Sequence, residues 1–356
     1  MGGTDSYGPG MTTASNFDEF ERVVARRGVR SGLPVIVAVH SSALGQAIGG
    51  CRLAPYPDWR DGLTDALRLS AAMTAKCAVA GLPHGGAKTV VALPPGTTLD
   101  AGLRRAVLHD VGDTIESLGG DYATGPDVGT GPEDMAVIGE RTDHVFCRPV
   151  GAGGSGDSSG PTAEGVLAAL AALAPVAGRR FAIMGLGRVG AHVARELAAS
   201  GAELVVTDVD DSRRQLAAEL GATWTDDILT AEADVLVPAA LGGVLTAATV
   251  ARLRCAEICG PANNQLDRPE TAELLHERGI LWAPDFVVSA GGVIHATGVE
   301  LRGETEAQAR EQVRGIAGTL TTVLDSARRR GVTPLAAAHG LARARIDAAR
   351  QATMAA

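Results

Sequence analysis

Residues 181–190 read FAIMGLGRVG, and this stretch decides the fold of the second half of the chain. The apolar run Phe181–Met184 predicts a buried strand. The glycines that follow, Gly185, Gly187 and Gly190, fit the pattern G-x-G-x-x-G. In this pattern the first glycine makes a tight turn, the second lets a pyrophosphate approach the backbone, and the third lets the next helix pack closely on the strand.

The segments after this stretch alternate between helix and strand patterns. Expected helices at Arg188–Ser200 and Ser212–Leu220 separate expected strands at Glu203–Thr207 and Val235–Pro238. Alternation of this kind is typical of βαβ units and a parallel sheet. The fold class is therefore α/β, with a Rossmann-type doubly wound domain in this half.

The cofactor that this motif favours is NAD. Asp208 ends the next expected strand, 23 residues after Gly185. A carboxylate there would accept hydrogen bonds from the adenosine ribose and repel a 2′-phosphate, which favours NAD over NADP. The helix N-terminus formed by Leu186, Arg188 and Val189 offers N–H groups to the phosphates. A Rossmann-like fold with an empty nucleotide site is the alternative.

The first half of the chain predicts a mixed α/β domain. Strands are expected at Pro34–His40, Thr89–Leu93 and Asp121–Thr124, and helices at Asp61–Ala80 and Leu99–Leu118. The Gly/Ser-rich stretch Gly151–Gly160 separates the halves. Helices at Glu304–Arg330 and Pro334–Ala349 are expected to fold back onto the first half. We therefore expect a substrate-binding domain of residues 1–150 plus 325–356, an NAD domain of residues 151–324, and a cleft between them.

Composition narrows the classes of function. The 356 residues carry a formal net charge of −9, which disfavours a nucleic-acid-binding surface. No apolar run reaches the length of about 20 residues that a membrane helix needs. The segment Gly2–Ser15 has no apolar core and is read as a loose tail rather than a signal peptide. The five cysteines lack disulfide, metal-ligand or redox-motif spacing, so we expect reduced thiols, no metal site and a cytoplasmic protein.

Lysine is almost absent from the chain. Only Lys76 and Lys88 occur, while every other basic residue apart from histidine is arginine. Arginine can replace lysine on a solvated face, but it cannot replace a compact ammonium group that must lose its proton near neutral pH. The two lysines lie only 12 residues apart, which indicates chemistry rather than chance retention.

Several spaced motifs occur around these lysines in one order along the chain, and they extend into the second half. They are Gly49-Gly-Cys-Arg52, Met73-Thr-Ala-Lys76, Gly85-Gly-Ala-Lys88, Thr124-Gly-Pro-Asp127, Pro261-Ala-Asn-Asn264, Ala283-Pro-Asp-Phe286 and Ala290-Gly-Gly292. In these motifs the chain resembles the glutamate/leucine/phenylalanine/valine dehydrogenase family over nearly its whole length. The resemblance implies NAD-dependent oxidative deamination of an L-amino acid to a 2-oxo acid and ammonia, in a homo-oligomer.

The resemblance also implies the roles of individual residues. Lys88 would activate the water that attacks the imine, and Asp127 would carry protons to and from the amine. Lys76 would hold the substrate carboxylate, helped by the Gly49 and Gly50 backbone and by Asn264. The remaining cofactor contacts would come from Thr162, Ala239 and Asn263. Burial in a closing cleft beside Lys76 should favour a neutral Lys88 amine, which can act as a base.

The side-chain pocket favours an apolar amino acid. Glutamate-specific relatives carry a lysine where this chain has Ile48, and a carboxylate buried against isoleucine would cost several kcal/mol. The resemblance places Leu44, Gly125, Val293 and Ala296 around the substrate side chain. Gly125 and Ala296 suggest a roomy pocket, so phenylalanine is favoured, with leucine or valine as the alternative.

The chain departs from the family pattern at one position of these motifs. Family members usually have asparagine where this chain has Ser289, which can still form hydrogen bonds but with a shorter reach. A catalytically silent NAD-binding relative is the alternative of another class, although such a protein would not need Lys76, Lys88 and Asp127 together. Turnover of an L-amino acid with NAD would separate these hypotheses.

Overall fold

The computed structural model describes residues 17–355, so the expected tail at Gly2–Ser15 lies outside the described residues. The first half contains a five-stranded sheet in the order β1-β2-β4-β3-β5, in which β1 and β2 are antiparallel to their neighbours and β3 is parallel to both β4 and β5. Its strands are β1 (Arg22–Arg27), β2 (Pro34–Ser41), β3 (Ala47–Pro55), β4 (Gly85–Leu93) and β5 (Tyr122–Pro126). Its helices are α1 (Trp59–Ala80), α2 (Ala101–Glu116) and α3 (Pro132–Ile138).

Both faces of this sheet are covered, and the side chains of β2 show how. Val35, Val37 and Val39 point into the core shared with α2, whereas Ile36 and Ala38 join a second cluster against α1. This is the two-residue period of a strand buried on both faces. Asp58 begins α1 by accepting a hydrogen bond from the Arg60 N–H, and Gly81 in the left-handed conformation ends it.

The second half contains a parallel six-stranded sheet in the order β11-β10-β9-β6-β7-β8. Its strands are β6 (Arg180–Met184), β7 (Glu203–Thr207), β8 (Thr223–Trp224), β9 (Val235–Pro238), β10 (Glu257–Ile258) and β11 (Leu281–Trp282). The chain leaves β6 toward β7 and returns on its other side at β9, so the topology reverses beside the glycine motif. This reversal is the place where doubly wound sheets bind ligands.

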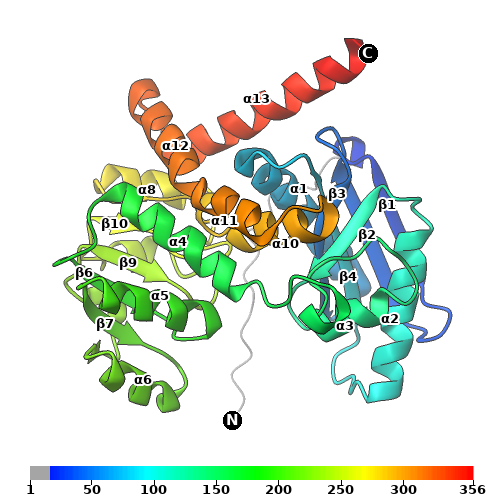
Figure 1. The fold of residues 1–356 in the computed structure, drawn as a ribbon, viewed down its shortest axis with the longest axis horizontal. Coiled ribbons are helices and arrows are strands. Elements are labelled where there is room, and N and C mark those ends of the chain that lie inside the picture. Colours follow the sequence, from blue (N-terminus) through cyan, green and yellow to red (C-terminus); the bar gives the residue numbers. More distant parts are fainter. Residues whose placement is uncertain (1–16, 356) are drawn as a thin grey trace.

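The helices of the second half cover its sheet and reach across to the first half (Figure 1). They are α4 (Ser159–Leu173), α5 (Arg188–Ala199), α6 (Arg214–Glu219), α7 (Ala247–Val250), α8 (Thr271–Glu277), α9 (Asp285–Val288), α10 (Gly291–Leu301), α11 (Glu306–Arg314), α12 (Ile316–Arg330) and α13 (Pro334–Ala355). The C-terminal helix α13 packs against α1, where Arg345 donates hydrogen bonds to the Ala78 and Val79 carbonyls. The last helix therefore returns to the first half.

Among the differences between the structure and the sequence prediction, three concern the glycine motifs and the C-terminal helices. β4 begins at Gly85 rather than Thr89, so Lys88 lies within a strand and not in the glycine turn before it. Gly49 and Gly50 lie inside β3, for which the sequence predicted no strand, because glycine lowers β-propensity even where packing demands it. The expected helix Glu304–Arg330 is two helices that meet at Gly315.

Helices of the described part of the chain are too short or too polar to cross a membrane. The five cysteines are free thiols; Cys51, Cys77, Cys147 and Cys259 are buried and Cys255 is partly exposed.

Candidate active site

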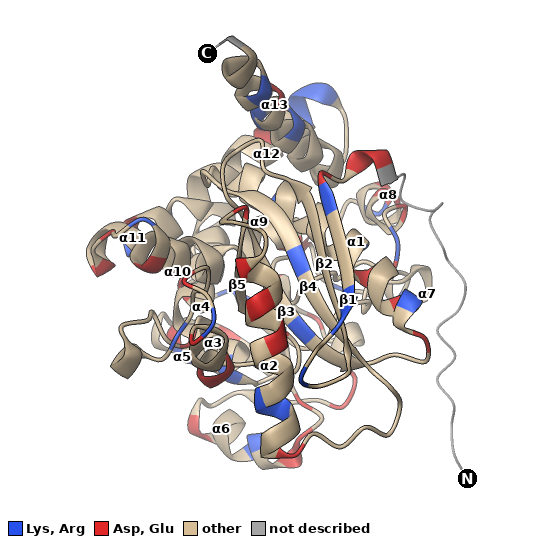
Figure 2. Cartoon of the chain, turned by 90° about the vertical axis from the view of Figure 1, so that its right-hand side faces the viewer, with Lys and Arg blue, Asp and Glu red and all other residues tan. Residues whose placement is uncertain are grey.

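A cleft of about 270 Å³ lies where the two halves meet. Its first wall comes from β3, β4, α1 and the end of β5, and its second wall from residues 263–264, α9 and α10. Both lysines of the chain, Lys76 and Lys88, line it together with Asp127. Lys88 is the charged residue of β4, whose sequence is GGAKTVVAL, and Figure 2 shows one blue segment on this otherwise tan strand.

Lys88 and Asp127 form an ion pair across β3. Lys88 lies on β4 and is only 5% exposed, and Asp127 directly follows β5. The strand between them, β3, carries Gly50, and the position of Gly50 explains why the Gly49–Arg52 motif has glycine there. A Cβ there would lie 2.7 Å from the Asp127 Cβ and 3.1 Å from the Lys88 Nζ. The missing side chain therefore leaves the space in which the ammonium and carboxylate groups meet.

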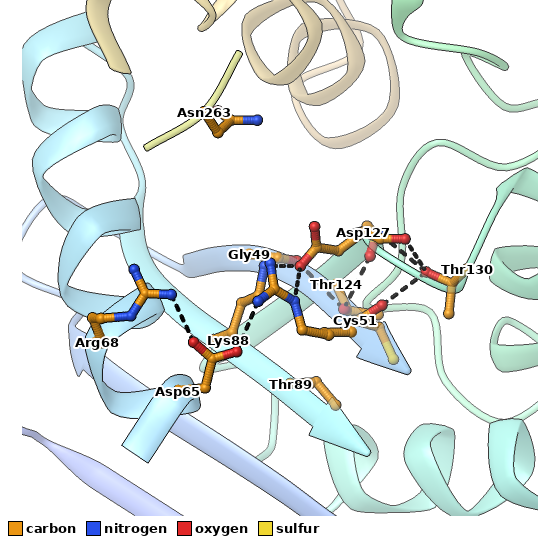
Figure 3. A network of polar contacts seen from close by, with 12 residues as sticks. Gly49, Cys51, Asp65, Arg68, Lys88, Thr89, Thr124, Asp127, Thr130 and Asn263 are labelled. Atoms are coloured by element: carbon orange, nitrogen blue, oxygen red, sulfur yellow. Dashed lines mark hydrogen bonds and ion pairs between the residues drawn. The ribbon is translucent and has the colours of Figure 1, made fainter. Parts of the chain in front are cut away.

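Asp127 is held in its ionised form. Burial raises the pKa of its carboxyl group, but Lys88 and Arg52 favour the charged form and hold the pKa below its ordinary value. The Arg52 Nε lies 3.1 Å from the Asp127 Oδ2. The Thr130 hydroxyl accepts a hydrogen bond of 3.0 Å from the Asp127 backbone N–H and donates one to the Cys51 carbonyl at 2.7 Å. The loop after β5 is thus tied to β3, as Figure 3 shows.

Lys76 projects from α1 into the opposite side of the cleft. Its Nζ donates to the Asn263 Oδ1 at 3.2 Å and to the Ser289 Oγ at 3.0 Å. Burial lowers its pKa, and the nearby Asp285 carboxylate opposes that shift. Ser289, the departure from the family pattern, therefore contacts Lys76 and also donates to Asn263 at 3.2 Å.

The two asparagines of the Pro261–Asn264 motif have different places. Asn263 contacts Lys76 directly and lies across the cleft from the Asp127 network in Figure 3. Asn264 lines the cleft with a left-handed backbone (φ 54°), and its carbonyl accepts from the Gly243 N–H at 2.7 Å. Buried Asp285 accepts from the Gln265 N–H at 2.9 Å, which fixes this loop. The structure thus pairs Lys76 with Asn263 rather than with Asn264.

An arginine–aspartate network behind Asp127 was not recognised in the sequence. The Arg52 Nη1 lies 2.7 Å from the Asp65 Oδ2, and the same oxygen accepts from the Tyr56 hydroxyl at 2.7 Å. Arg68 pairs with the other oxygen, also at 2.7 Å. Asp65 and Arg68 are three residues apart on α1, so their spacing was visible, but ordinary surface pairs show the same spacing.

The glycine motif has the geometry of a dinucleotide site. Gly185 has a φ of 104°, which only glycine adopts freely, and a Cβ at Gly190 would lie 2.0 Å from the Gly185 carbonyl oxygen. At Gly187 a Cβ would meet nothing within 4 Å, so the backbone faces open space there. No side chain caps α5 at Gly187, which leaves the N–H groups of its first turn available to a phosphate. The residues present therefore fit a dinucleotide.

The acidic residue of this motif lies beside the turn. The Asp208 Oδ2 accepts from the Leu186 N–H at 2.5 Å, and its Oδ1 accepts from the Asp210 N–H at 2.9 Å. Ala239 follows β9 and lies next to Gly190. Thr162, on α4, lies against Gly292 at the start of α10. The exposed Arg188 pairs with Asp157 at 3.3 Å, and Val189 is half-buried behind it.

The predicted side-chain pocket is only partly assembled in the cleft. Gly125 and Val293 line it, whereas Leu44 and Ala296 do not and pack instead within or against the hydrophobic core. Phe146 is a lining residue that the sequence did not reveal. A Cβ at Gly125 would lie 2.5 Å from its ring, so the ring occupies the space beside the missing side chain. Ile48 is fully buried and offers no charge to a distal carboxylate.

Within residues 17–355, no group of three or more His, Cys, Asp or Glu side chains is arranged to hold a metal ion.

Comparison with known proteins agrees with this geometry. A family model described as "Glu/Leu/Phe/Val dehydrogenase, dimerisation domain" matches residues 22–144, and one described as "Glutamate/Leucine/Phenylalanine/Valine dehydrogenase" matches residues 206–353. The chain is 37% identical to the phenylalanine dehydrogenase of Caldalkalibacillus thermarum (strain TA2.A1), over 94% of this chain and 93% of that protein. It is 38% identical to the leucine dehydrogenase of Bacillus subtilis (strain 168), again over 94% of this chain and 93% of that protein.

A solved structure is similar over the same range. The crystal structure of L-tryptophan dehydrogenase from Nostoc punctiforme superposes with a TM-score of 0.81 at 32% identity, covering 94% of this chain and 97% of the other. Family models, relatives and structure agree over both halves. The chain belongs to the glutamate/leucine/phenylalanine/valine dehydrogenase family, whose members are NAD(P)-dependent amino acid dehydrogenases.

Proposed function

We propose that this enzyme uses NAD to deaminate an apolar or aromatic L-amino acid oxidatively, in a reversible reaction that gives the 2-oxo acid and ammonia. The observation that carries the proposal is the meeting of Lys76, Lys88 and Asp127 in one cleft between the two halves. A chain with so few lysines places both of them where an α-amino acid needs a carboxylate anchor and a base.

Lys76 is the anchor for the substrate α-carboxylate. Its ammonium group faces the cleft, and its partners Asn263 and Ser289 are neutral; among residues 17–355 no carboxylate is in direct contact with it. An incoming carboxylate would form a charge-assisted bond there. The backbone of Gly49 and Gly50 and the Asn264 side chain complete this end of the cleft.

Asp127 and Lys88 move protons at the other end. Asp127, ionised in the free enzyme, takes a proton from the substrate ammonium group, and the neutral amine then loses hydrogen from Cα. Bound NAD would supply the acceptor for that hydrogen and its electron pair. Once protonated, Asp127 no longer stabilises the charge of buried Lys88, which can then release its proton to solvent water. Neutral Lys88 deprotonates the water that attacks the iminium carbon, and Asp127 protonates the amino group of the resulting carbinolamine. As the C–N bond breaks, the carbinolamine hydroxyl returns a proton to Asp127, which leaves ammonia and the 2-oxo acid.

NAD is the cofactor that the nucleotide end favours. The Asp208 carboxylate lies beside the glycine turn, where it would receive ribose hydroxyls and repel a 2′-phosphate. Gly185, Gly187 and Gly190 would hold the pyrophosphate at the N-terminus of α5, with Leu186, Arg188 and Val189 in the same turn. Thr162, Ala239 and Asn263 would lie along the remainder of the dinucleotide.

Gly125 leaves room in the pocket and therefore favours phenylalanine as the substrate. Leucine or valine is the second candidate, because the Phe146 ring takes up part of that room. The Phe146 ring lies against Gly125 and occupies part of the room that the glycine provides. Gly125 and Val293 remain the proposed side-chain contacts, with Phe146 added, whereas Leu44 and Ala296 support this wall from the core. Because a single methylene changes discrimination by only about 1–3 kcal/mol, the difference between these substrates is small.

The proposed function also assigns a role to each half of the molecule. We propose that residues 1–150 plus 325–356 act as the substrate domain and residues 151–324 as the NAD domain, and that the cleft closes to exclude water. The family model that matches residues 22–144 is described as a dimerisation domain, which supports a homo-oligomer. A cytoplasmic location fits the free, mostly buried thiols.

A panel of L-amino acids tests the proposal. The purified enzyme is incubated with L-phenylalanine, L-leucine, L-valine, L-tryptophan or L-glutamate, with NAD and separately with NADP, and the reduced cofactor is followed by its absorbance. We expect turnover of an apolar or aromatic amino acid with NAD, and much weaker activity with L-glutamate or with NADP. Turnover of none of them would favour a silent dinucleotide-binding protein, and preference for L-glutamate would overturn the pocket assignment.

A further inference from the structure

Arg52 bridges two carboxylates at the edge of the cleft. Its Nε contacts the Asp127 Oδ2 at 3.1 Å, while its Nη1 contacts the Asp65 Oδ2 at 2.7 Å. The guanidinium is only 19% exposed, so both contacts are shielded from water. Arg52 is on β3 and Asp65 is on α1, so the bridge ties the strand beneath the cleft to the helix that carries Lys76.

The outer carboxylate is itself fixed from three directions. Besides Arg52, Asp65 accepts from the Tyr56 hydroxyl and from Arg68, both at 2.7 Å, and its side chain is 15% exposed. Figure 3 shows Asp65 between Arg68 and the Lys88–Asp127 group. A carboxylate with three donors cannot rotate freely, and it therefore fixes the plane of the guanidinium that contacts Asp127.

We propose that Arg52 is a positioning residue, oriented by Asp65, that holds the Asp127 carboxylate against Lys88 and keeps it ionised until a substrate ammonium group delivers a proton. The proposal rests on the proposed function of Asp127 and Lys88 and assigns them a shared support. Arginine suits this task because its planar fork contacts two carboxylates at once, which the point charge of lysine cannot do with the same geometry.

Other titratable groups are near enough to Asp127 to interact with it electrostatically. Lys88 lies on β4 and Lys76 on α1, and the buried Cys51 thiol and Tyr122 phenol lie on β3 and β5. Of these, Lys88 and Arg52 are the cations in direct contact with Asp127. Without Arg52, the Asp127 carboxylate would contact Lys88 as its remaining cation and could move into the space that the guanidinium occupied.

The test is the pH profile of kcat/KM for Arg52→Gln, measured with NAD and with L-phenylalanine or L-leucine, whichever the unmodified enzyme turns over faster. An opposite charge within about 4–6 Å lowers the pKa of a carboxyl group by roughly 1–3 units. We therefore expect the acidic limb of the profile to move to higher pH by about one unit, and kcat to fall at least tenfold. An acidic limb that stays in place would overturn the proposal.

Three further variants separate positioning from a merely structural role. Asp65→Asn removes the anchor of Arg52 and also a negative charge near Asp127, two changes that move the acidic limb in opposite directions, so its readout is kcat, which should fall several-fold. Arg52→Lys keeps the positive charge and should restore the limb to near its original pH. The matched control Arg22→Gln removes another arginine–aspartate pair, 2.9 Å long, from the edge of the same sheet and should leave the profile unchanged.

An unchanged kcat in Asp65→Asn, or an Arg52→Lys profile identical to that of Arg52→Gln, would contradict the assignment. The result also stands apart from the proposed function. If the unmodified enzyme turns over no amino acid, the proposed function itself fails. If the unmodified enzyme is active and the limb of Arg52→Gln does not move, only the role of Arg52 fails.

Discussion

At the scale of single residues, the two lysines explain most of the chemistry. A chain that uses arginine almost everywhere retains lysine at two positions, and both side chains reach the same cleft. Lys88 contacts a carboxylate, whereas Lys76 contacts neutral oxygens. We infer that this difference separates two roles: Lys88, paired with Asp127, takes part in proton transfer, and Lys76, with its neutral partners, binds the carboxylate of the substrate.

Lys76→Met should weaken binding of the amino acid selectively. The variant loses a charge-assisted contact with the α-carboxylate, which is worth about 1.5–3 kcal/mol, or roughly 10- to 100-fold in KM for the amino acid. Steady-state kinetics with each substrate varied in turn checks this. The KM for NAD should change little. An equal rise in both KM values, or a rise for NAD alone, would contradict the role of Lys76.

Some residues of the site could be predicted from the sequence, and others could not. The lysines, Asp127 and the glycines stand in local motifs, so the sequence indicated them together. Arg52 stands beside Gly49 and Gly50 in the sequence, but its partner Asp65 lies on the next helix, and no local sequence pattern indicates that contact. Phe146 was not predicted for the same reason, since only the fold brings its ring against Gly125.

At the scale of elements, the segment that joins the two halves is held by one buried carboxylate. Glu300 on α10 has a side chain that is 1% exposed and accepts from the Cys147 and Ser155 N–H groups, both at 2.7 Å. It also accepts from the Ser155 hydroxyl at 2.6 Å and pairs with Arg148 at 3.2 Å. The backbone of Cys147 is left-handed, with a φ of 59°. We infer that Glu300 stabilises this unusual turn at the crossing between the halves.

Glu300→Gln should therefore destabilise the fold markedly. The amide keeps the size of the side chain but turns one acceptor into a donor that faces other donors. Removing one partner of a buried charged network costs about 3–5 kcal/mol. Urea unfolding measures the loss. The control Glu306→Gln removes an exposed carboxylate from α11 and should cost less than about 1 kcal/mol. Equal losses in both variants would contradict the role of Glu300.

The boundaries of elements were harder to predict than their existence. The predicted parallel strands of the second half occur as β6, β7 and β9, because apolar runs between glycine and polar turns mark them clearly. β3 was missed because its Gly49-Gly50 pair lowers local strand propensity. In the structure β3 lies between β4 and β5, and those neighbours hold it in the sheet.

At the scale of the whole molecule, acid should destabilise the protein in two stages. Burial lowers the pKa of His40, His84 and His339, so the unfolded chain binds protons more readily and stability falls as pH drops below about 6.5. Asp110 and Asp127 have pKa values held below their ordinary range by hydrogen bonds and nearby cations, so a second loss follows below about pH 4. Buried Asp285, whose pKa is raised, acts in the opposite direction, because its protonation stabilises the folded protein as the pH falls toward about 4, before the second loss begins.

Unfolding by urea at pH 8, 5.5 and 3.5 measures both stages. A variant with His40, His84 and His339 replaced by glutamine should show a smaller fall between pH 8 and 5.5 than the unmodified protein. Its further fall between pH 5.5 and 3.5 should be similar to that of the unmodified protein. An undiminished fall in the first interval would show that these histidines do not contribute to it.

The central claim is that the amine of Lys88 acts as a base in the cleft, and kcat of Lys88→Arg tests it most directly. Arginine keeps the positive charge but cannot be deprotonated in a protein. Because a positioned general base contributes about 10²- to 10⁴-fold, we predict that kcat with the preferred amino acid and NAD falls by at least a hundredfold, while the melting temperature and NAD binding change little. A Lys88→Arg enzyme that turns over at nearly the unmodified rate would contradict the account.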